Sequence, residues 1–309
     1  MSATSKKTAA LKPLKGVRIL SLALNLPGPA ALMRCRQMGA TCIKLEPPAG
    51  DPMGLYNPAA YRQLHEGVKV LTADLKTAAG QKTLHRELAK TDVLLTSFRP
   101  SAIVKLGLTW QALHRQHPQL SQIAIVGAPG ERGEEAGHDL TYLAESGLVT
   151  GLDLPATLYA DMGGSLMASE AVLQAVMHQR RQGDGIYLEI ALSSAAGYLA
   201  LPRAWGLTQP GAAVGGGHAG YRVYPCQDGR VALAALEPHF ALRLCAAVGI
   251  KAASMKAMFE PATHEAVAAF LLTRTRSELD ALAAAKDIPL FTLGIESVGD
   301  DWNRIKRAC

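Results

Sequence analysis

The chain has 309 residues and a formal net charge of +6; 49% of its residues are hydrophobic, 19% are charged and 5% are aromatic. A chain of this length can bury a sizeable core in one large or two modest domains, and this composition excludes wholesale disorder. Lysine and arginine are spread along the chain and aromatic residues are few, so we expect no nucleic-acid partner. The positive charge is typical either of a well-solvated surface or of a protein that binds an anion such as a phosphorylated cofactor.

Targeting and cysteine patterns add two further expectations. The sequence has no apolar run of 18 residues and no recognisable signal peptide, so we expect a cytoplasmic protein without a membrane partner. Its five cysteines form an odd set without a CxxC pair or paired metal spacing. We therefore predict no metal site.

The first part of the chain alternates strand and helix patterns. Apolar, β-rich runs predict five strands, at 17–24, 41–46, 68–75, 92–98 and 120–127. Helices are expected between them, at 29–38, 78–90 and 109–116. This alternation predicts an α/β domain with an open, mainly parallel sheet.

The second part has a different pattern. A long helix is expected over 163–182, then a strand at 186–192 and an apolar helical stretch to about 207. After a glycine-rich segment at 209–220, two strands flank Gln227-Asp228-Gly229, a strong hairpin signal. Three helices are expected beyond the hairpin, at 237–248, 263–272 and 276–285. We therefore place an α/β domain at 1–207 and a smaller α+β domain at 208–289, with residues 290–309 as a candidate to complete the first.

Basic residues follow two of the predicted parallel strands. Open parallel sheets bind ligands at the carboxyl ends of their strands. Lys76 follows the third strand, and Arg99 and Lys105 follow the fourth. These three side chains are candidates to bind phosphate groups, although each could simply solvate a loop.

Several common nucleotide and hydrolase motifs are absent. The first strand–helix turn, LPGPA, lacks GxGxxG, and neither GxxxxGK[ST] nor GxSxG occurs. The sequence therefore does not support dinucleotide binding, P-loop phosphoryl transfer or serine-hydrolase chemistry.

One imidazole and two carboxylates lie beside glycines or at the edges of predicted elements. They are His138 in AGHDLTYLAESG, Asp161 in YADMGGS and Glu237 in LAALEPHF. Such a set is suited to moving a carbon-bound proton. Asp161 immediately precedes the predicted helix, where free backbone N–H groups could stabilise an enolate oxygen. The same residues could also be only a helix N-cap and a polar loop residue.

Seven stretches of the chain carry a family likeness. In chain order they are GVRILSLALNLPGPAALMRCRQMGATCIKLEPP, VLTADLKTAAG, DVLLTSFRPSAIVKLGL, AGHDLTYLAESGLV, ADMGGSLMASEAVL, YRVYPCQDGRVALAALEPHF and IPLFTL. In these stretches, which cover most of residues 16–250, the chain resembles the family III CoA-transferase group, and within it most closely the α-methylacyl-CoA racemases. The resemblance implies a Rossmann-like CoA-binding domain, a smaller domain, and a homodimer whose two chains are interlinked like rings.

The resemblance also implies roles for individual residues. The catalytic positions fall on His138, Asp161 and Glu237. The positions that contact CoA fall on Ala73, Lys76, Arg99, Lys105, Gly137, Asp139 and Tyr142. The substrate is then an acyl-CoA thioester, and no cofactor is bound permanently.

Three functions remain open. A racemase or epimerase would exchange the α-proton of a 2-methylacyl-CoA through an enolate, with His138 and Asp161 as the two bases and Glu237 orienting the imidazole. A family III CoA-transferase would use Asp161 as the nucleophile that forms an acyl-aspartyl anhydride, and Gly215–Gly217 is similar to that branch's mobile glycine loop. A non-catalytic acyl-CoA-binding protein is the third. A transferase does not need both His138 and Glu237, so their joint presence favours the racemase.

The sequence also departs from the family in three places. Pro47 stands where many members have an arginine, so we expect Lys44 to replace a missing phosphate contact. The segment between Gly147 and Asp161 is short, which should reshape the acyl pocket. The chain ends some tens of residues before a typical member, so we expect a curtailed C-terminal segment.

Overall fold

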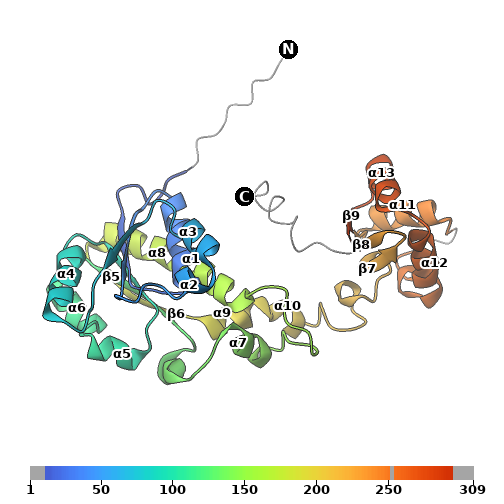
Figure 1. Ribbon diagram of the computed structural model, residues 1–309. Coiled ribbons are helices and arrows are strands. Elements are labelled where there is room, and N and C mark those ends of the chain that lie inside the picture. Colours follow the sequence, from blue (N-terminus) through green and yellow to red (C-terminus); the bar gives the residue numbers. More distant parts are fainter. Residues whose placement is uncertain (1–10, 251–253, 295–309) are drawn as a thin grey trace, which may run out of the picture. The chain divides into compact units, whose positions relative to one another are not determined.

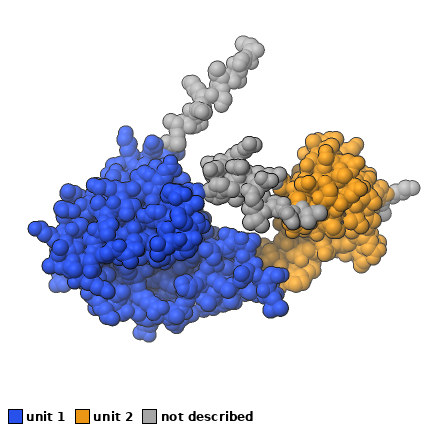
Figure 2. All heavy atoms as spheres, viewed as in Figure 1, with its two compact units in different colours: residues 1–200 blue, residues 201–309 orange. Residues whose placement is uncertain are grey.

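The structure is a computed structural model that describes residues 11–250 and 254–294. It divides into two compact units, residues 1–200 and residues 201–309 (Figure 2). Within the described ranges, no helix is both long and apolar enough to cross a lipid bilayer.

The first unit, coloured blue to yellow in Figure 1, is built on a six-stranded parallel sheet. The strand order is β3-β2-β1-β4-β5-β6. Its strands are β1 (Arg18–Ser21), β2 (Thr41–Glu46), β3 (Lys69–Thr72), β4 (Val93–Thr96), β5 (Ser121–Val126) and β6 (Tyr187–Ala191). The chain runs outward from β1 to β3 and then returns to the other side of β1 for β4. The strand order therefore reverses between β1 and β4. The predicted α/β fold with an open, parallel sheet is confirmed.

Helices cover both faces of this sheet. They are α1 (Pro27–Gln37), α2 (Met53–Tyr56), α3 (Pro58–Leu64), α4 (Ala78–Leu88), α5 (Pro100–Lys105), α6 (Trp110–Gln116), α7 (Asp139–Glu145), α8 (Tyr159–Gln182) and α9 (Leu192–Leu199). Successive residues of a strand point to opposite faces. Ile19 and Leu95 accordingly pack with α1 and α8, whereas Leu20 and Leu94 pack with α4 and α6. Side chains at alternating positions of β1 and β4 thus pack into two separate core layers.

Four helices of this unit were not predicted from the sequence: α2, α3, α5 and α7. Each has only four to seven residues. So short a segment shows too little of the 3.6-residue period to be recognised by its pattern. Their ends carry the signal instead; Asn57 accepts a hydrogen bond from the Ala60 N–H at 3.1 Å and is followed by Pro58, a favoured first helical residue.

Helix α8 begins at Tyr159, four residues before the predicted start at 163. The glycines that suggested a helix boundary are inside the helix because other side chains pack against them. A Cβ on Gly164 would lie 2.3 Å from Leu192 Cδ2, and one on Gly163 would lie 3.1 Å from Leu199 Cδ1. These glycines allow α9 to approach α8 closely, so Asp161 lies within the first turn rather than before it.

The second unit contains a three-stranded antiparallel sheet in the order β7-β8-β9. Its elements are α10 (Leu201–Ala204), β7 (Tyr221–Cys226), β8 (Gly229–Ala234), α11 (Pro238–Val248), α12 (Pro261–Leu272), α13 (Arg276–Lys286) and β9 (Leu290–Leu293). The predicted hairpin turn at Gln227-Asp228 joins β7 to β8. The segment 290–309, expected to complete the first domain, instead supplies β9 to this sheet; its residues 295–309 lie outside the described ranges. The interlinked dimer stays a prediction.

The close packing of α1 on the chain leaving β1 generates a stability prediction. Gly28 is buried in the first turn of α1, and a Cβ there would lie 2.1 Å from the Ala23 Cβ. Gly28→Ala should therefore lower the free energy of unfolding by about 1–3 kcal/mol through overpacking. Urea unfolding measures this. Gly197→Ala in α9 is the matched control, because its Cβ would meet nothing within 4 Å; it should be neutral or slightly stabilising. Equal stabilities for the two variants would contradict the packing argument.

Candidate active site

A cleft of about 560 Å³ opens in the first unit at the carboxyl ends of β1, β4 and β5. The segments that leave these strands line it: Leu24–Pro27 after β1, Ser97–Arg99 after β4, and Gly127 after β5. The strand order reverses between β1 and β4, and open α/β sheets bind ligands in the crevice that such a reversal creates. The fold thus places the cleft where a ligand site is expected.

His138 and Asp161, two of the three predicted catalytic residues, line this same cleft. His138 immediately precedes α7. Its backbone N–H donates to Thr141 Oγ1 at 3.0 Å, and its carbonyl accepts from the same hydroxyl at 2.7 Å. These bonds fix the backbone at the start of α7. The His138 imidazole lines the cleft, where a ligand can meet it.

Asp161 is held in place by a second carboxylate. The Asp161 backbone N–H donates to Oδ1 of Asp139 at 2.9 Å, and Asp139 is only 5% exposed. This bond joins the first turn of α7 to the first turn of α8. Burial, followed by the nearby Asp139 charge, raises the pKa of the Asp161 carboxyl from 3.8 to about 6, while His138 acts in the opposite direction. Asp161 can therefore gain and lose a proton close to neutral pH.

The early start of α8 corrects one expectation about this site. The helix start that follows Asp161 was expected to offer free backbone N–H groups to an enolate oxygen. Instead, the Asp161 N–H is bonded to Asp139, and the Met162 N–H donates to the Leu158 carbonyl at 3.0 Å. Both donors are used within the protein because these residues already belong to the helix.

Tyr142 explains why glycine occupies two positions of the cleft wall. Tyr142 is 7% exposed. A Cβ on Gly127 would lie 2.3 Å from the Tyr142 hydroxyl oxygen, and a Cβ on Gly137 would lie 2.6 Å from it. Tyr142, Gly127 and Gly137 all line the cleft. Burial and then the Asp161 charge raise the pKa of the Tyr142 hydroxyl, so it stays protonated. Tyr142 and Gly137, both predicted to contact the ligand, are thus part of the same site as Asp161.

Arg99 is the one of the three predicted phosphate-binding residues that lines the cleft. Lys76 and Lys105 are exposed and lie outside its lining. Their two turns are nevertheless neighbours, since the Gln81 side-chain amide donates to the carbonyls of Leu75 at 2.6 Å and Leu106 at 3.5 Å.

Two other predicted positions lie elsewhere. Ala73 follows β3, packs against the sheet core and donates its N–H to the Glu46 carbonyl at 2.9 Å. Glu237 belongs to the second unit, where it immediately precedes α11. Its role in orienting His138 stays a prediction.

Lys44 does not replace the missing phosphate contact. Its side chain is fully buried, and its ammonium is paired with Glu46 and Asp51. A lysine in this position cannot reach a ligand at the surface, so that expectation is wrong.

One wall of the cleft was missed from the sequence. No element was predicted in this part of the chain. The cleft is lined here by residues of α2, of α3 and of the position between them: Met53, Tyr56, Asn57 and Ala60. Glu135, between β5 and α7, lines it as well. The signal for this wall was the Asn57-Pro58 helix start, which fixes where α3 begins.

The raised pKa of Asp161 predicts a pH-dependent effect on stability. A carboxyl whose pKa is higher in the folded protein stabilises the fold when protonated, and this stability is lost as pH rises from about 4 through about 6. Asp161→Asn should therefore be more stable than the parent at pH 8, by about 1–2 kcal/mol because the carboxyl is only partly buried. The difference should vanish at pH 3.5. Urea unfolding across this range measures it, with the exposed Asp153→Asn as control. A pH-independent difference would contradict the shift.

Comparisons with known proteins place these features in a family. The family model of CoA-transferase family III matches residues 14–294. A probable fatty acyl-CoA transferase of Mycobacterium tuberculosis is 30% identical over 208 residues, which are 60% of this chain and 52% of that protein. A succinyl-CoA–D-citramalate CoA-transferase of Chloroflexus aurantiacus is 34% identical over 198 residues, 59% of this chain and 49% of that one. The human alpha-methylacyl-CoA racemase is 28% identical over 256 residues, 77% of this chain and 65% of that one. The chain thus spans about half the length of the first two relatives.

Solved structures agree on the fold. A crystal structure of a hypothetical protein from Mycobacterium tuberculosis superposes with a TM-score of 0.81 at 23% identity, covering 96% of this chain and 88% of that one. A CAIB/BAIF family protein from Brucella suis gives a TM-score of 0.80 at 24% identity, with the same coverage. At these identities the likeness establishes the fold alone. Because the family model matches nearly the whole chain, from residue 14 to residue 294, this protein belongs to CoA-transferase family III.

Proposed function

We propose that this protein is an acyl-CoA racemase or epimerase that exchanges the α-proton of a 2-methylacyl-CoA thioester. The observation that carries the proposal is the pairing of His138 with Asp161 in one cleft, together with the rise in the pKa of Asp161 to about 6. The cleft thus holds an imidazole and a carboxyl, two side-chain types that serve as general acids and bases.

The chemistry needs two such groups. The α-carbon of a thioester is a weak acid, and inverting its configuration requires one base to remove the proton and a second acid to return one to the opposite face. Neutral His138 can take the proton while protonated Asp161 returns one, and the reverse reaction exchanges their roles. Asp139 contributes by keeping the pKa of Asp161 high enough for its protonated form to be populated.

The CoA part of the substrate is assigned to the basic side of the cleft. Arg99 lines the cleft, immediately before Pro100 at the start of α5, and a guanidinium can hold a phosphate oxygen pair in a bidentate fork. Lys76 and Lys105 add positive charge on the two turns joined by Gln81. The thioester is a substrate, and the proposed reaction needs no permanently bound cofactor.

A family III CoA-transferase is the second candidate. The relatives named above include transferases as well as a racemase. In that reaction Asp161 would act as a nucleophile and form an acyl anhydride. A transferase of this kind does not need an imidazole beside the carboxylate, so the presence of His138 in the same cleft supports the racemase.

Deuterium incorporation tests the proposed function. In D₂O the parent should incorporate deuterium at the α-carbon of a single enantiomer of a 2-methylacyl-CoA, measured by mass spectrometry. His138→Ala and Asp161→Asn should each reduce exchange by about a hundredfold or more, the lower range for loss of an acid–base group. His178→Ala, near the other end of α8, is the matched control and should exchange like the parent. If the parent binds the thioester without exchanging or transferring it, the protein is a non-catalytic acyl-CoA-binding protein.

Hydroxylamine separates the racemase from the transferase. A transferase should leave a hydroxamate on Asp161 when hydroxylamine is added during turnover with an acyl-CoA and a free acid. A racemase should leave none, because no bond forms between Asp161 and the acyl group. Peptide mass spectrometry detects the adduct, and finding it would replace the proposed activity with CoA transfer.

The assignment of the CoA-binding side predicts a loss of affinity in Arg99→Ala. Removing one charged contact to a phosphate should cost about 1–3 kcal/mol of CoA binding free energy. Lys76→Ala and Lys105→Ala should cost less, and binding should weaken as salt is raised because exposed charges are screened. Calorimetry measures all three variants beside Arg115→Ala, an exposed arginine of α6. Parent-like binding by every variant would mean that CoA binds elsewhere.

A further inference from the structure

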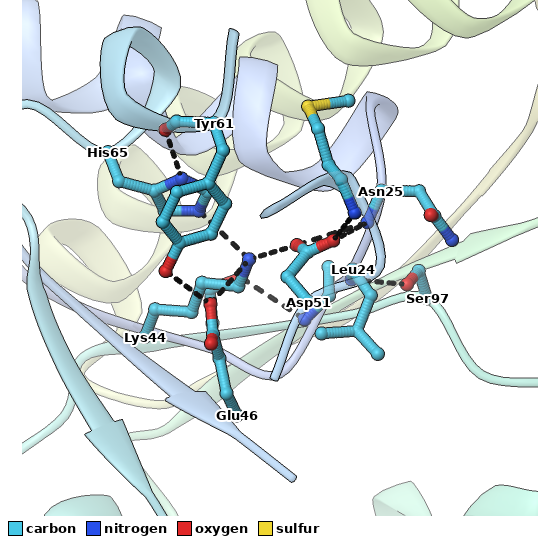
Figure 3. Close-up of polar contacts among 11 residues, drawn as sticks. Leu24, Asn25, Lys44, Glu46, Asp51, Tyr61, His65 and Ser97 are labelled. Atoms are coloured by element: carbon cyan, nitrogen blue, oxygen red, sulfur yellow. Dashed lines mark hydrogen bonds and ion pairs between the residues drawn. The ribbon is translucent and has the colours of Figure 1, made fainter. Parts of the chain in front are cut away.

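A buried ionic cluster lies directly behind the wall of the cleft (Figure 3). At its centre is Lys44, whose side chain is 0% exposed. The Lys44 ammonium donates to Oδ2 of Asp51 and to Nε2 of His65 at 2.9 Å. It also forms an ion pair with Oε1 of Glu46 at 3.2 Å. The buried cation is therefore surrounded by two carboxylates and an imidazole.

The neighbours of Lys44 are themselves held in one protonation state. His65 accepts from Lys44 through Nε2, so its Nδ1 carries the proton and donates to the Tyr61 carbonyl at 2.7 Å. Burial and the Lys44 charge hold the pKa of His65 below its ordinary value. Burial and its hydrogen bond to Glu46, at 3.0 Å, raise the pKa of Tyr61 to about 12. The cluster thus keeps one hydrogen-bond arrangement across the neutral pH range.

The three acceptors of Lys44 have the composition of a metal site. Oxygen or nitrogen atoms of Glu46, Asp51 and His65 lie within 4.8 Å of one another. The Lys44 ammonium hydrogen-bonds Asp51 and His65 and is ion-paired with Glu46. The positive charge that the cluster needs is supplied by the lysine, so we assign this cluster a positioning role rather than metal binding.

Asp51 connects the cluster to two segments of the cleft wall. Its carboxylate accepts the Asn25 backbone N–H at 3.1 and 3.2 Å, and it accepts the Met53 backbone N–H at 2.9 Å. Asn25 lies in the turn between β1 and α1, and Met53 is the first residue of α2. Both residues line the cleft. One buried carboxylate therefore accepts hydrogen bonds from two segments of the cleft wall that are 28 residues apart in the chain.

The residue that Asp51 holds through its backbone N–H, Asn25, has an unusual backbone conformation. Asn25 has a φ of 65°, in the left-handed region that non-glycine residues rarely occupy. Such a conformation persists where the surroundings over-determine it, and it is frequent at functional sites. The preceding residue is fixed as well, since the Leu24 N–H donates to Ser97 Oγ at 3.2 Å. The turn is thus held by Asp51, which follows β2, and by Ser97, which follows β4.

We propose that Asp51, with its charge balanced by Lys44, is a positioning residue that holds the Asn25 turn and the start of α2 in the geometry that binds the acyl-CoA. The inference rests on the proposed function for the identity of the ligand. In the described part of the chain, the hydrogen bonds and ion pair of Asp51 go to Asn25, Met53 and Lys44, and none goes to α7 or α8, the helices beside His138 and Asp161. Loosening it should therefore weaken binding of the ligand while the proton-transfer step stays intact.

The variants that test this role are Asp51→Asn and Lys44→Met. The amide of Asp51→Asn has the shape of the carboxylate but cannot accept all the N–H groups that Asp51 accepts. Lys44→Met leaves a buried carboxylate without its counter-ion and could prevent folding. The double variant Lys44→Met/Asp51→Asn removes both charges and keeps the test possible. Glu87→Gln is the matched control, because Glu87 is also a largely buried carboxylate, paired with Arg18, and lies outside the cleft.

Two readouts are measured on the full chain. In Asp51→Asn, amide hydrogen exchange at Asn25 and Met53 should accelerate at least tenfold, and KM for the 2-methylacyl-CoA in the deuterium incorporation assay should rise about tenfold with kcat within twofold of the parent. Glu87→Gln should change neither. If the parent binds the thioester without turnover, the dissociation constant takes the place of KM, so failure of the proposed function does not hide the result.

Any of three outcomes would overturn the inference. Unchanged amide exchange at Asn25 and Met53 in Asp51→Asn would show that the carboxylate does not hold the wall. Faster exchange with unchanged KM or dissociation constant would show that the wall it holds does not bind the ligand. A fall in kcat alone would assign Asp51 to the proton-transfer step instead.

Discussion

The reversal of strand order between β1 and β4 is the constraint on which the site depends. Because all six strands are parallel, their carboxyl ends meet at one edge, and the reversal leaves a crevice there that no crossover helix fills. The segments after β1, β4 and β5 must therefore line it, and they carry Asn25, Arg99 and Gly127. Helices α7 and α8 follow β5 and bring His138 and Asp161 to the same edge. A turn, an arginine, an imidazole and a carboxyl thus share one cleft as a consequence of topology.

Two buried carboxylates then support this cleft in different ways. Asp139 accepts the Asp161 N–H and places a like charge beside its carboxyl, so it both locates that residue and raises its pKa. Asp51 is neutralised by Lys44 and holds backbone segments only. The two carboxylates differ in charge balance. Asp139, for which the described residues show no ion pair, influences protonation in the cleft, whereas Asp51, which is paired with Lys44, influences its geometry. The proposed reaction needs both, since proton transfer depends on the first and the fit of the thioester on the second.

Most of the first unit could be predicted because its strands are long apolar runs bounded by glycine or proline, as in β2, predicted and found at 41–46. Helices α2, α3, α5 and α7 could not, and α3 is an example because it depends on the Asn57 cap rather than on a repeating apolar face. The sequence also misplaced the start of α8, because Gly163 and Gly164 serve helix packing and not a helix boundary. At the site, a motif located His138 and Asp161, but no local pattern reveals that Lys44 is buried or that Asp51 reaches back to Asn25. Those contacts join residues 7 to 26 positions apart and exist only once the sheet has formed.

Burial and the Asp139 charge raise the pKa of Asp161 to about 6, and the proposed racemisation depends on this shift. Carbon-13 NMR of the side-chain carboxyl groups tests it directly, with Asp161→Asn used to assign the Asp161 signal. We expect a titration midpoint near pH 6 for the free protein, and a lower midpoint in Asp139→Asn. A midpoint near 4 in the parent, unchanged in Asp139→Asn, would contradict the shift and, with it, the role of Asp161 as the group that returns a proton.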